Sequence, residues 1–181
     1  MMTITLFGSS KPPAGSQEYV LAYEVGRALA HAGFIVCNGG YGGTMEAAAR
    51  GAKEFGGSTV GVTADVFDRD PNQWIDKEIR EKTLVDRLSR LIEIGDAYVV
   101  FKGGTGTLLE LAAVWEFVNK GLIREKPIVI VGAFWKPLVG VMREELLWEG
   151  LGDCTRLISQ VGTAHECAEV LRIRLSTPSR K

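Results

Sequence analysis

The sequence predicts an α/β protein built on a parallel sheet with helices on both faces. Short β-branched runs alternate along the chain with longer stretches of helical periodicity, as in successive strand–helix–strand units. The runs are almost continuously apolar, which is typical of parallel strands buried on both faces. No internal repeat, low-complexity segment or linker divides the 181 residues. We therefore expect one Rossmann-like, doubly wound domain over residues 1–175, followed by a flexible basic tail at residues 176–181.

Six strands are expected. They are Ile4–Phe7, Phe34–Cys37, Thr59–Val62, Ala97–Phe101, Ile128–Val131 and a weaker strand near Arg156–Ser159. Residues 64–80 have the least regular pattern, so we expect a long loop there that could serve as a lid or a dimer contact.

Helices are expected between and after these strands. The first has Ser16 as its N-cap and one apolar stripe, which consists of Leu21, Val25, Ala28, Leu29 and Ala32. The second begins near Thr44, and a third covers Leu84–Ile94. The others are expected at residues 107–120, at residues 137–149 and after a capping box at residues 163–166.

Composition and charge narrow the functional classes. The hydrophobic share of 46% and the charged share of 24% are ordinary for a soluble globular protein. The net charge is −1 without a large block of like charges, so we expect neither nucleic acid nor a membrane as a partner. No apolar run approaches the roughly 18 residues that cross a bilayer, and the N-terminus lacks the pattern of a signal peptide. We expect a cytoplasmic protein.

Disulfide and metal chemistry are not expected either. The cysteines Cys37, Cys154 and Cys167 are odd in number and widely spaced, so we interpret them as reduced, mostly buried thiols. The histidines His31 and His165 lie far apart without the spacing of metal ligands. We predict no metal and no cofactor.

The expected strand order locates a ligand site. In a doubly wound sheet of order 3-2-1-4-5-6, ligands bind where the order reverses, beyond the carboxyl ends of strands one and four. The loops at these two ends are residues 8–10 and residues 102–107. We expect the two loops to face each other across the crevice.

Both loops have the composition of an anion site. Their glycines leave backbone N–H groups accessible, and the helix that follows the second loop adds its positive N-terminal end. The predicted phosphate-binding residues of these loops are Gly8, Ser9, Ser10, Gly103, Gly104, Thr105, Gly106 and Thr107. The alternative is that the glycines only tighten strand-to-helix packing.

A second glycine cluster follows the second strand and lies beside the first loop. Its expected ligand-binding residues are Gly39, Gly40, Gly43 and Met45. Met45 could equally fill the core, and we expect Tyr41 to be an exposed turn residue rather than a stacking platform. The chain lacks a P-loop and the third glycine of the dinucleotide fingerprint, which disfavours P-loop hydrolysis and an NAD-type oxidoreductase.

Glu110 and Arg87 are the candidate chemical groups. Thr107 and Glu110 satisfy the capping-box spacing, so the carboxylate could close the helix end or face the crevice. Arg87 has no acidic neighbour at helical spacing, whereas Arg90 has two. Arg87 is either a solvated surface residue or is available for an anionic group across the crevice.

The stretch GGTGTLLE at residues 103–110 resembles the P-G-G-x-G-T-x-x-E signature of the lonely-guy (LOG) family. These proteins are cytokinin-activating phosphoribohydrolases, also labelled lysine decarboxylase-like. The resemblance extends over most of the chain and places Arg87 at the essential arginine of the family. Lys102 replaces the proline of the signature, and Asn38, Thr44 and Glu46 also depart from the family pattern. Residues 42–48 are more similar to a neighbouring branch that includes molybdenum-cofactor carrier proteins.

The resemblance implies hydrolysis of the N-glycosidic bond of a nucleoside 5′-monophosphate, either AMP or a cytokinin ribotide, with Glu110 and Arg87 as catalytic residues. It also implies a homodimer. The alternative is a carrier or sensor that binds a nucleotide or the molybdenum cofactor without turnover, with Lys102 as a further cation for the ligand.

Overall fold

The structure is a computed structural model of the chain and describes residues 1–176. Its sheet contains seven parallel strands. They are β1 (Thr3–Phe7), β2 (Ile35–Asn38), β3 (Thr59–Ala64), β4 (Lys77–Glu81), β5 (Ala97–Val100), β6 (Ile128–Val131) and β7 (Ile158–Val161). The order across the sheet is β4-β3-β2-β1-β5-β6-β7, so the chain reverses between β1 and β5. The predicted fold class and the predicted order of the six expected strands are confirmed.

The expectation of a long loop at residues 64–80 holds for residues 68–76, which lack regular structure, but the segment also contains a short 3-10 helix, η1 (Asp65–Phe67), and most of β4. The sequence of β4 is KEIRE, in which only Ile79 is apolar. An edge strand has one hydrogen-bonding neighbour, and charged residues protect its free edge from further pairing. Its pairing with β3 places Ile79 opposite Val62.

The weak strand expected near Arg156–Ser159 is β7, and residues Cys154–Leu157 form a second 3-10 helix, η2.

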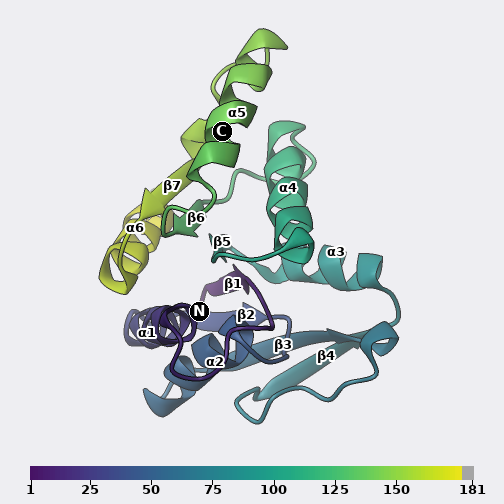
Figure 1. Cartoon of the computed structure of the whole chain (residues 1–181), viewed down its shortest axis with the longest axis vertical. Coiled ribbons are helices and arrows are strands. Elements are labelled where there is room, and N and C mark those ends of the chain that lie inside the picture. The colour runs from purple at the N-terminus through teal and green to yellow at the C-terminus, as the bar shows by residue number, and fades with distance from the viewer. Residues whose placement is uncertain (177–181) are drawn as a thin grey trace.

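Six α-helices cover the two faces of the sheet (Figure 1). They are α1 (Gln17–His31), α2 (Thr44–Glu54), α3 (Leu84–Ile94), α4 (Thr105–Asn119), α5 (Lys136–Trp148) and α6 (Ala164–Ser176). Helices α1, α2 and α6 lie on one face, and α3, α4 and α5 lie on the other. The domain predicted to end at residue 175 thus includes nearly all of α6. The tail expected at residues 176–181 lies, apart from Ser176, outside the described residues.

Local sequence signals explain most helix ends. The Ser16 side chain accepts a hydrogen bond from the backbone N–H of Tyr19 (3.3 Å), as expected of an N-cap. The predicted capping box before α6 is confirmed, since Thr163 and Glu166 each accept a hydrogen bond from the other residue's backbone N–H (3.2 Å for both).

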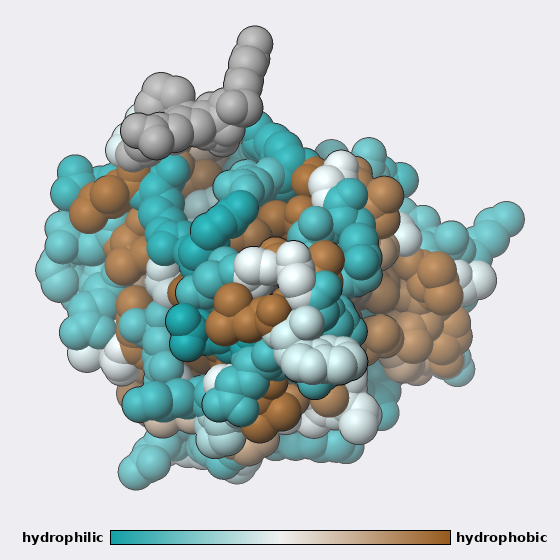
Figure 2. Space-filling view, turned by 90° about the horizontal axis from the view of Figure 1, so that it is seen from above, coloured by the Kyte–Doolittle hydropathy of each residue, from teal (hydrophilic) through white to brown (hydrophobic). Residues whose placement is uncertain are grey.

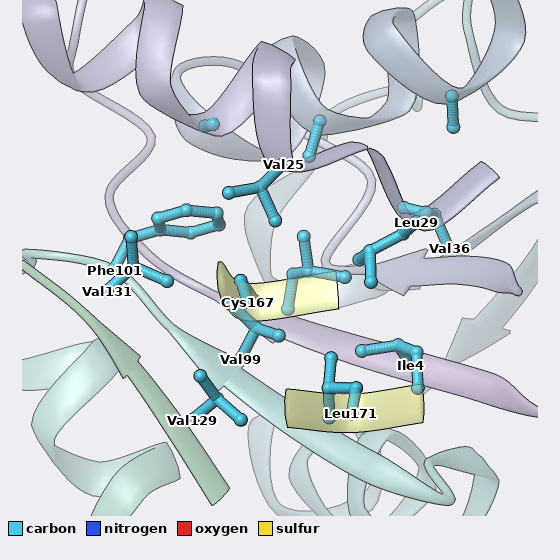
Figure 3. Close-up of a cluster of buried hydrophobic side chains, with 14 of the residues drawn as sticks. Ile4, Val25, Leu29, Val36, Val99, Phe101, Val129, Val131, Cys167 and Leu171 are labelled. Carbon is cyan, nitrogen blue, oxygen red and sulfur yellow. The ribbon is translucent and has the colours of Figure 1, made fainter. Parts of the chain in front are cut away.

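Two apolar layers hold the helices on the sheet. Figure 3 shows the layer beneath α1 and α6, where Val25 and Leu29 point from α1 toward Val36 and Val99 on the strands. The second layer packs α3, α4 and α5 on the opposite face around buried residues such as Tyr98 and Leu111. In the space-filling view of Figure 2, groups of hydrophobic residues also interrupt the hydrophilic surface. Among the described residues, no helix is long and apolar enough to span a membrane.

Candidate active site

A cavity of about 520 Å³ opens at the carboxyl ends of β1 and β5, where the strand order reverses. Its walls come from the loop after β1, the segments after β2 and β3, helix α3 and the start of α4. The lining residues are Gly8, Ser9, Ser10, Lys11, Tyr41, Met45, Val66, Phe67, Arg69, Arg87, Gly104, Thr105, Gly106, Thr107 and Glu110. The two loops expected to meet at the crevice therefore do so, and ten of these lining residues are predicted site residues.

The loop after β1 is held in place from the start of α2. The backbone N–H of Thr44 donates to the carbonyl of Ser9 (2.9 Å), and the Thr44 hydroxyl donates to the same oxygen (3.1 Å). The Ser9 hydroxyl accepts a hydrogen bond from the backbone N–H of Lys11 (3.1 Å), and its own proton remains available to donate a hydrogen bond to a ligand. Thr44, one of the departures from the LOG pattern, therefore fixes one wall of the cavity.

Helix α4 presents an open N-terminus to the cavity. The helix begins at Thr105 with Gly104 as its N-cap, and no side chain in the described part of the chain caps it. The capping-box interpretation of Thr107 and Glu110 was therefore wrong, because the helix starts three residues earlier than that pattern requires. The first-turn N–H groups, including those of Gly106 and Thr107, lack intrahelical partners and carry the positive end of the helix dipole.

Glu110 lies in the second turn of α4 with its side chain 14% exposed. Burial raises the pKa of this carboxyl to about 7, and the positive charge of Arg87 opposes that rise. A carboxyl with such a pKa exchanges a proton readily near neutral pH, which is the property of a general acid or base. The structure thus favours the crevice-facing alternative for Glu110.

Arg87 is buried on α3 rather than solvated, with its side chain 9% exposed. Its Nη1 lies 3.7 Å from Oε1 of Glu110, and its Nε donates to the carbonyl of Val62 (2.8 Å). The guanidinium also lies 5.6 Å from the ring centre of Tyr41 and 5.7 Å from that of Phe67. These contacts fix one orientation of the guanidinium, facing the carboxyl.

Four predicted site glycines lie behind the cavity wall. A Cβ atom at Gly39 would collide with Nη2 of Arg87, and one at Gly103 would collide with Oγ1 of Thr107. A Cβ at Gly43 would collide with backbone atoms of the loop after β1. The N–H of Gly40 is already bonded to Oδ1 of Asn38 (2.8 Å). These glycines allow the wall to close, while Gly8, Gly104 and Gly106 line it.

Tyr41 is buried, at 8% exposure, so the expectation of an exposed turn residue was wrong. Its hydroxyl accepts from the N–H of Ala64 (2.9 Å) and donates to the carbonyl of the same residue (3.3 Å). Asn72 donates to the carbonyls of Gly40 (3.0 Å) and Tyr41 (2.8 Å). The loop after β2 is thus attached to the segment after β3, which the sequence pattern gave no reason to expect.

Four residues that line the cavity were missed in the sequence: Lys11, Val66, Phe67 and Arg69. The last three belong to the segment that was expected to be an irregular loop. The only available signal was the presence of Val66 and Phe67 among charged residues. Lys102, by contrast, is not among the lining residues of this cavity and pairs with Glu18 (2.9 Å).

Within residues 1–176, no group of three or more His, Cys, Asp or Glu side chains could hold a metal ion. Cys37 and Cys167 are free and buried, and burial raises the pKa of each thiol to about 12. Cys37 lies within β2 and Cys167 on α6, and thiols with such a raised pKa are poor nucleophiles near neutral pH.

Comparison with known proteins finds a family model that matches this chain and relatives that are named for an enzymatic activity. The model of the SLOG cluster4 family matches residues 1–145. The chain is 30% identical over 161 residues to a cytokinin riboside 5′-monophosphate phosphoribohydrolase of Rhodococcoides fascians. The aligned region covers 85% of this chain and 80% of that protein. It is 36% identical over 122 residues to a protein of the same name in Mycobacterium tuberculosis, covering 66% of this chain and 65% of that protein.

Among solved structures, the molybdenum cofactor carrier protein of Chlamydomonas reinhardtii has a similar fold. The TM-score is 0.77 at 22% identity, and the superposition covers 97% of this chain and 99% of that one. At this level of identity the likeness concerns the fold alone.

Proposed function

This chain belongs to the SLOG cluster4 family, and we propose that it hydrolyses the N-glycosidic bond of a nucleoside 5′-monophosphate, giving a free base and ribose 5-phosphate. The two relatives named as phosphoribohydrolases support this reaction. The observation that carries the proposal is the buried pair of Glu110 and Arg87, 3.7 Å apart, in the same cavity as the open end of α4. AMP and cytokinin ribotides are the first substrates to consider.

The 5′-phosphate binds at the start of α4. The first-turn N–H groups and the hydroxyls of Thr105 and Thr107 donate to its oxygens, and Ser9 and Ser10 donate from the opposite loop. Glu110 is four residues beyond Gly106, about 6 Å along the helix axis. A ribose anchored by its phosphate can span that distance and bring C1′ to the carboxyl, which converts phosphate binding into orientation of the reacting bond.

Glu110 carries the chemistry. Cleavage of the glycosidic bond passes through a transition state with positive, oxocarbenium-like charge on the ribose, which the carboxylate stabilises. The water oxygen forms a bond to C1′ as the bond from C1′ to the base breaks. Glu110 accepts a proton from that water and passes it to the departing base, so atoms and charge balance.

Arg87 positions Glu110 and keeps a fraction of the Glu110 carboxyl groups ionised. Its charge opposes the rise in the pKa of Glu110 that burial causes. Because the Val62 carbonyl and two rings hold the guanidinium, it can act on the carboxyl without reorienting during the reaction.

The test is incubation of the purified chain with AMP, GMP and isopentenyl-AMP, with chromatographic detection of free base. We expect the wild type to release base and Glu110→Gln to be slower by about 100-fold or more. Glu116→Gln, on the exposed side of the same helix, is the matched control and should retain activity. The proposal fails if the wild type releases no base or if Glu110→Gln is as active as the control.

A second candidate function is a carrier that binds a phosphorylated ligand without turnover. The molybdenum cofactor carrier protein shares the fold over 97% of this chain, so the fold is compatible with binding without turnover. In this case thermal stabilisation by an intact phosphorylated ligand would be seen, with no product after prolonged incubation. The same nucleotide panel therefore separates the two functions.

We also propose a homodimer. Exposed apolar side chains near α4 and α5 support it, since Leu122, Val141 and Trp148 are 69%, 65% and 82% exposed. Light scattering at micromolar concentration should give twice the chain mass of 19.7 kDa. A monomer mass under these conditions would contradict the proposal.

A further inference from the structure

The residues that line the cavity differ in chemistry. Ser9, Ser10 and the start of α4 supply hydroxyl and N–H donors. Tyr41 lines the cavity together with Val66, Phe67 and Arg69, which belong to residues 65–70, the segment that we call the lip. Arg87 links the two groups, since its guanidinium contacts Glu110 of α4 and also the rings of Tyr41 and Phe67. A ligand whose phosphate binds at the start of α4 can therefore extend past Glu110 and Arg87 toward the aromatic and cationic side chains of the lip.

Phe67 is suited to contact a flat ring. Its ring packs edge-on against Tyr41, with centres 5.6 Å apart and planes at 83°. The residue nevertheless remains 39% exposed while lining the cavity, so part of its surface is accessible to a ligand. Stacking of a base on an aromatic side chain is a general way in which proteins hold nucleotides.

The backbone places Phe67 and Arg69 together at the cavity. Asp68, between them, is the only non-glycine residue with a positive φ angle in the described part of the chain (φ 43°, ψ 51°). Asp tolerates this left-handed conformation better than most residues, and it turns the chain sharply at this point. Both flanking side chains line the cavity as a result.

Arg80 of β4 holds the lip from behind. Its guanidinium lies 3.9 Å from Asp65 and 3.7 Å from Asp70, which are the two ends of the segment. It also donates to the carbonyl of Arg69 (3.4 Å) and pairs with Glu78 (3.0 Å). These contacts place both ends of the lip beside an edge strand, and each ion pair is exposed to solvent.

Arg69 is the cation of the lip, and its side chain has no structural role assigned so far. Its guanidinium forms no ion pair or hydrogen bond with another residue of the described chain. A guanidinium only donates hydrogen bonds, and it matches two adjacent acceptors in a bidentate manner. The exposed edge of a 6-oxopurine carries two such acceptors, O6 and N7, whereas adenine replaces the first with an amino donor.

We propose that the lip is the base subsite, with Phe67 as the stacking surface and Arg69 as the specificity-determining residue that favours a 6-oxopurine nucleotide over an adenine nucleotide. This inference rests on the proposed function for the placement of the phosphate at α4. The proposed contact of Arg69 with the base makes GMP or IMP a better ligand than AMP.

Calorimetric titration of the whole chain with GMP, AMP and ribose 5-phosphate tests the inference, using Glu110→Gln as the background so that no ligand is consumed. We expect GMP to bind about tenfold or more tightly than AMP. Adding Arg69→Ala should bring the two affinities together without changing that of ribose 5-phosphate. Adding Phe67→Leu should weaken both nucleotides by about tenfold and leave ribose 5-phosphate unchanged.

Arg172→Ala, an exposed arginine on α6, is the matched control and should change none of the three affinities. Equal affinities for GMP and AMP, or an Arg69→Ala variant that retains the GMP preference, would overturn the inference. An Arg69→Ala variant that loses ribose 5-phosphate would overturn it as well, since the arginine would then contact phosphate. These binding measurements test the base subsite, whereas the release of base by the wild type tests the proposed function, so the failure of one is distinguishable from the failure of the other.

Discussion

The two glycine clusters of this chain look alike in sequence but differ in the structure. In residues 39–43, after β2, a Cβ atom at Gly39 or Gly43 would collide with atoms already in place. In residues 103–106, after β5, a Cβ at Gly104 or Gly106 would meet no atom of residues 1–176 within 4 Å. Gly39 and Gly43 of the first cluster are packing positions, whereas Gly104 and Gly106 of the second face the cavity and only Gly103 of that cluster packs against the protein, at Thr107.

This difference shows that glycine content alone does not identify a phosphate loop. Glycine permits a close approach of the backbone, and the approaching group can be the protein itself or a ligand. After β2 the approaching groups are the Arg87 guanidinium and the backbone of the loop after β1. After β5 the space is open and lies at a helix N-terminus, which is where an anion binds.

The largest effect is expected at Gly43, which has a φ of 66° and faces backbone atoms of Ser9 and Ser10. We expect Gly43→Ala to lower the free energy of unfolding by about 3–5 kcal/mol, from the left-handed backbone and the collision together. Gly132→Ala is the control, because its φ of 86° is similar but no described atom lies within 4 Å of its Cβ. Urea unfolding of both variants measures the difference, and equal losses would show that packing of the first cluster is unimportant.

The next effect concerns Glu110, whose side chain is 14% exposed and whose pKa is about 7 instead of 4.5. Because the folded-state pKa is the higher one, the protonated carboxyl stabilises the fold fully below about pH 4.5. This stabilisation is lost as the pH rises through 7, and amounts to about 3 kcal/mol. Glu110→Gln cannot titrate, so the stability of the wild type relative to this variant should fall between pH 4.5 and 8 in urea titrations. A difference that is constant with pH would contradict the raised pKa.

The fold was predictable because its strands and helices have strong local patterns. Ser16, the capping box at residues 163–166 and the apolar runs of the central strands each indicate structure within a few residues. Strand β4 could not be predicted, because its stability comes from hydrogen bonding with β3 and not from its own sequence KEIRE.

The candidate site was predictable in its location but not in its full composition. The strand order brings the loops after β1 and β5 together, so Ser9 and Thr107 could be placed near each other in advance. The contact of Arg87 with Glu110 links α3 to α4 and was only suggested by the missing helical partner of Arg87. The contribution of Phe67 depends on how the segment after β3 returns over the cavity, a tertiary feature that no local pattern records.

A smaller effect on folding, but a measurable one on activity, is expected at Gly39. Its Cβ would meet Nη2 of Arg87 and, at 2.7 Å, Sδ of Met45, which are side-chain atoms rather than backbone, so the methyl group would displace the Arg87 guanidinium from its contacts with Glu110 and the Val62 carbonyl. We expect Gly39→Ala to remain folded and to lower kcat for nucleotide hydrolysis by about 100-fold, since displacement of a positioning group by about 1 Å has effects of that order. Gly42→Ala, in the same loop with ordinary 3.6 Å contacts, should retain activity. Loss of activity in both variants would assign the effect to the loop in general.

The smallest effect distinguishes a ligand-facing glycine from an ordinary helical one. Gly106 lies in the first turn of α4, where alanine is a better helix former by up to about 1 kcal/mol. Gly106→Ala should therefore unfold at a slightly higher urea concentration, yet bind ribose 5-phosphate several-fold more weakly, because the added methyl group enters the space where the phosphate approaches the backbone. Gly140→Ala in α5, which also has open space around its Cβ among the described atoms, should show the gain in stability with unchanged binding. If ribose 5-phosphate binds both variants equally, the phosphate does not contact the first turn of α4, and the second glycine cluster has the same packing role as the first.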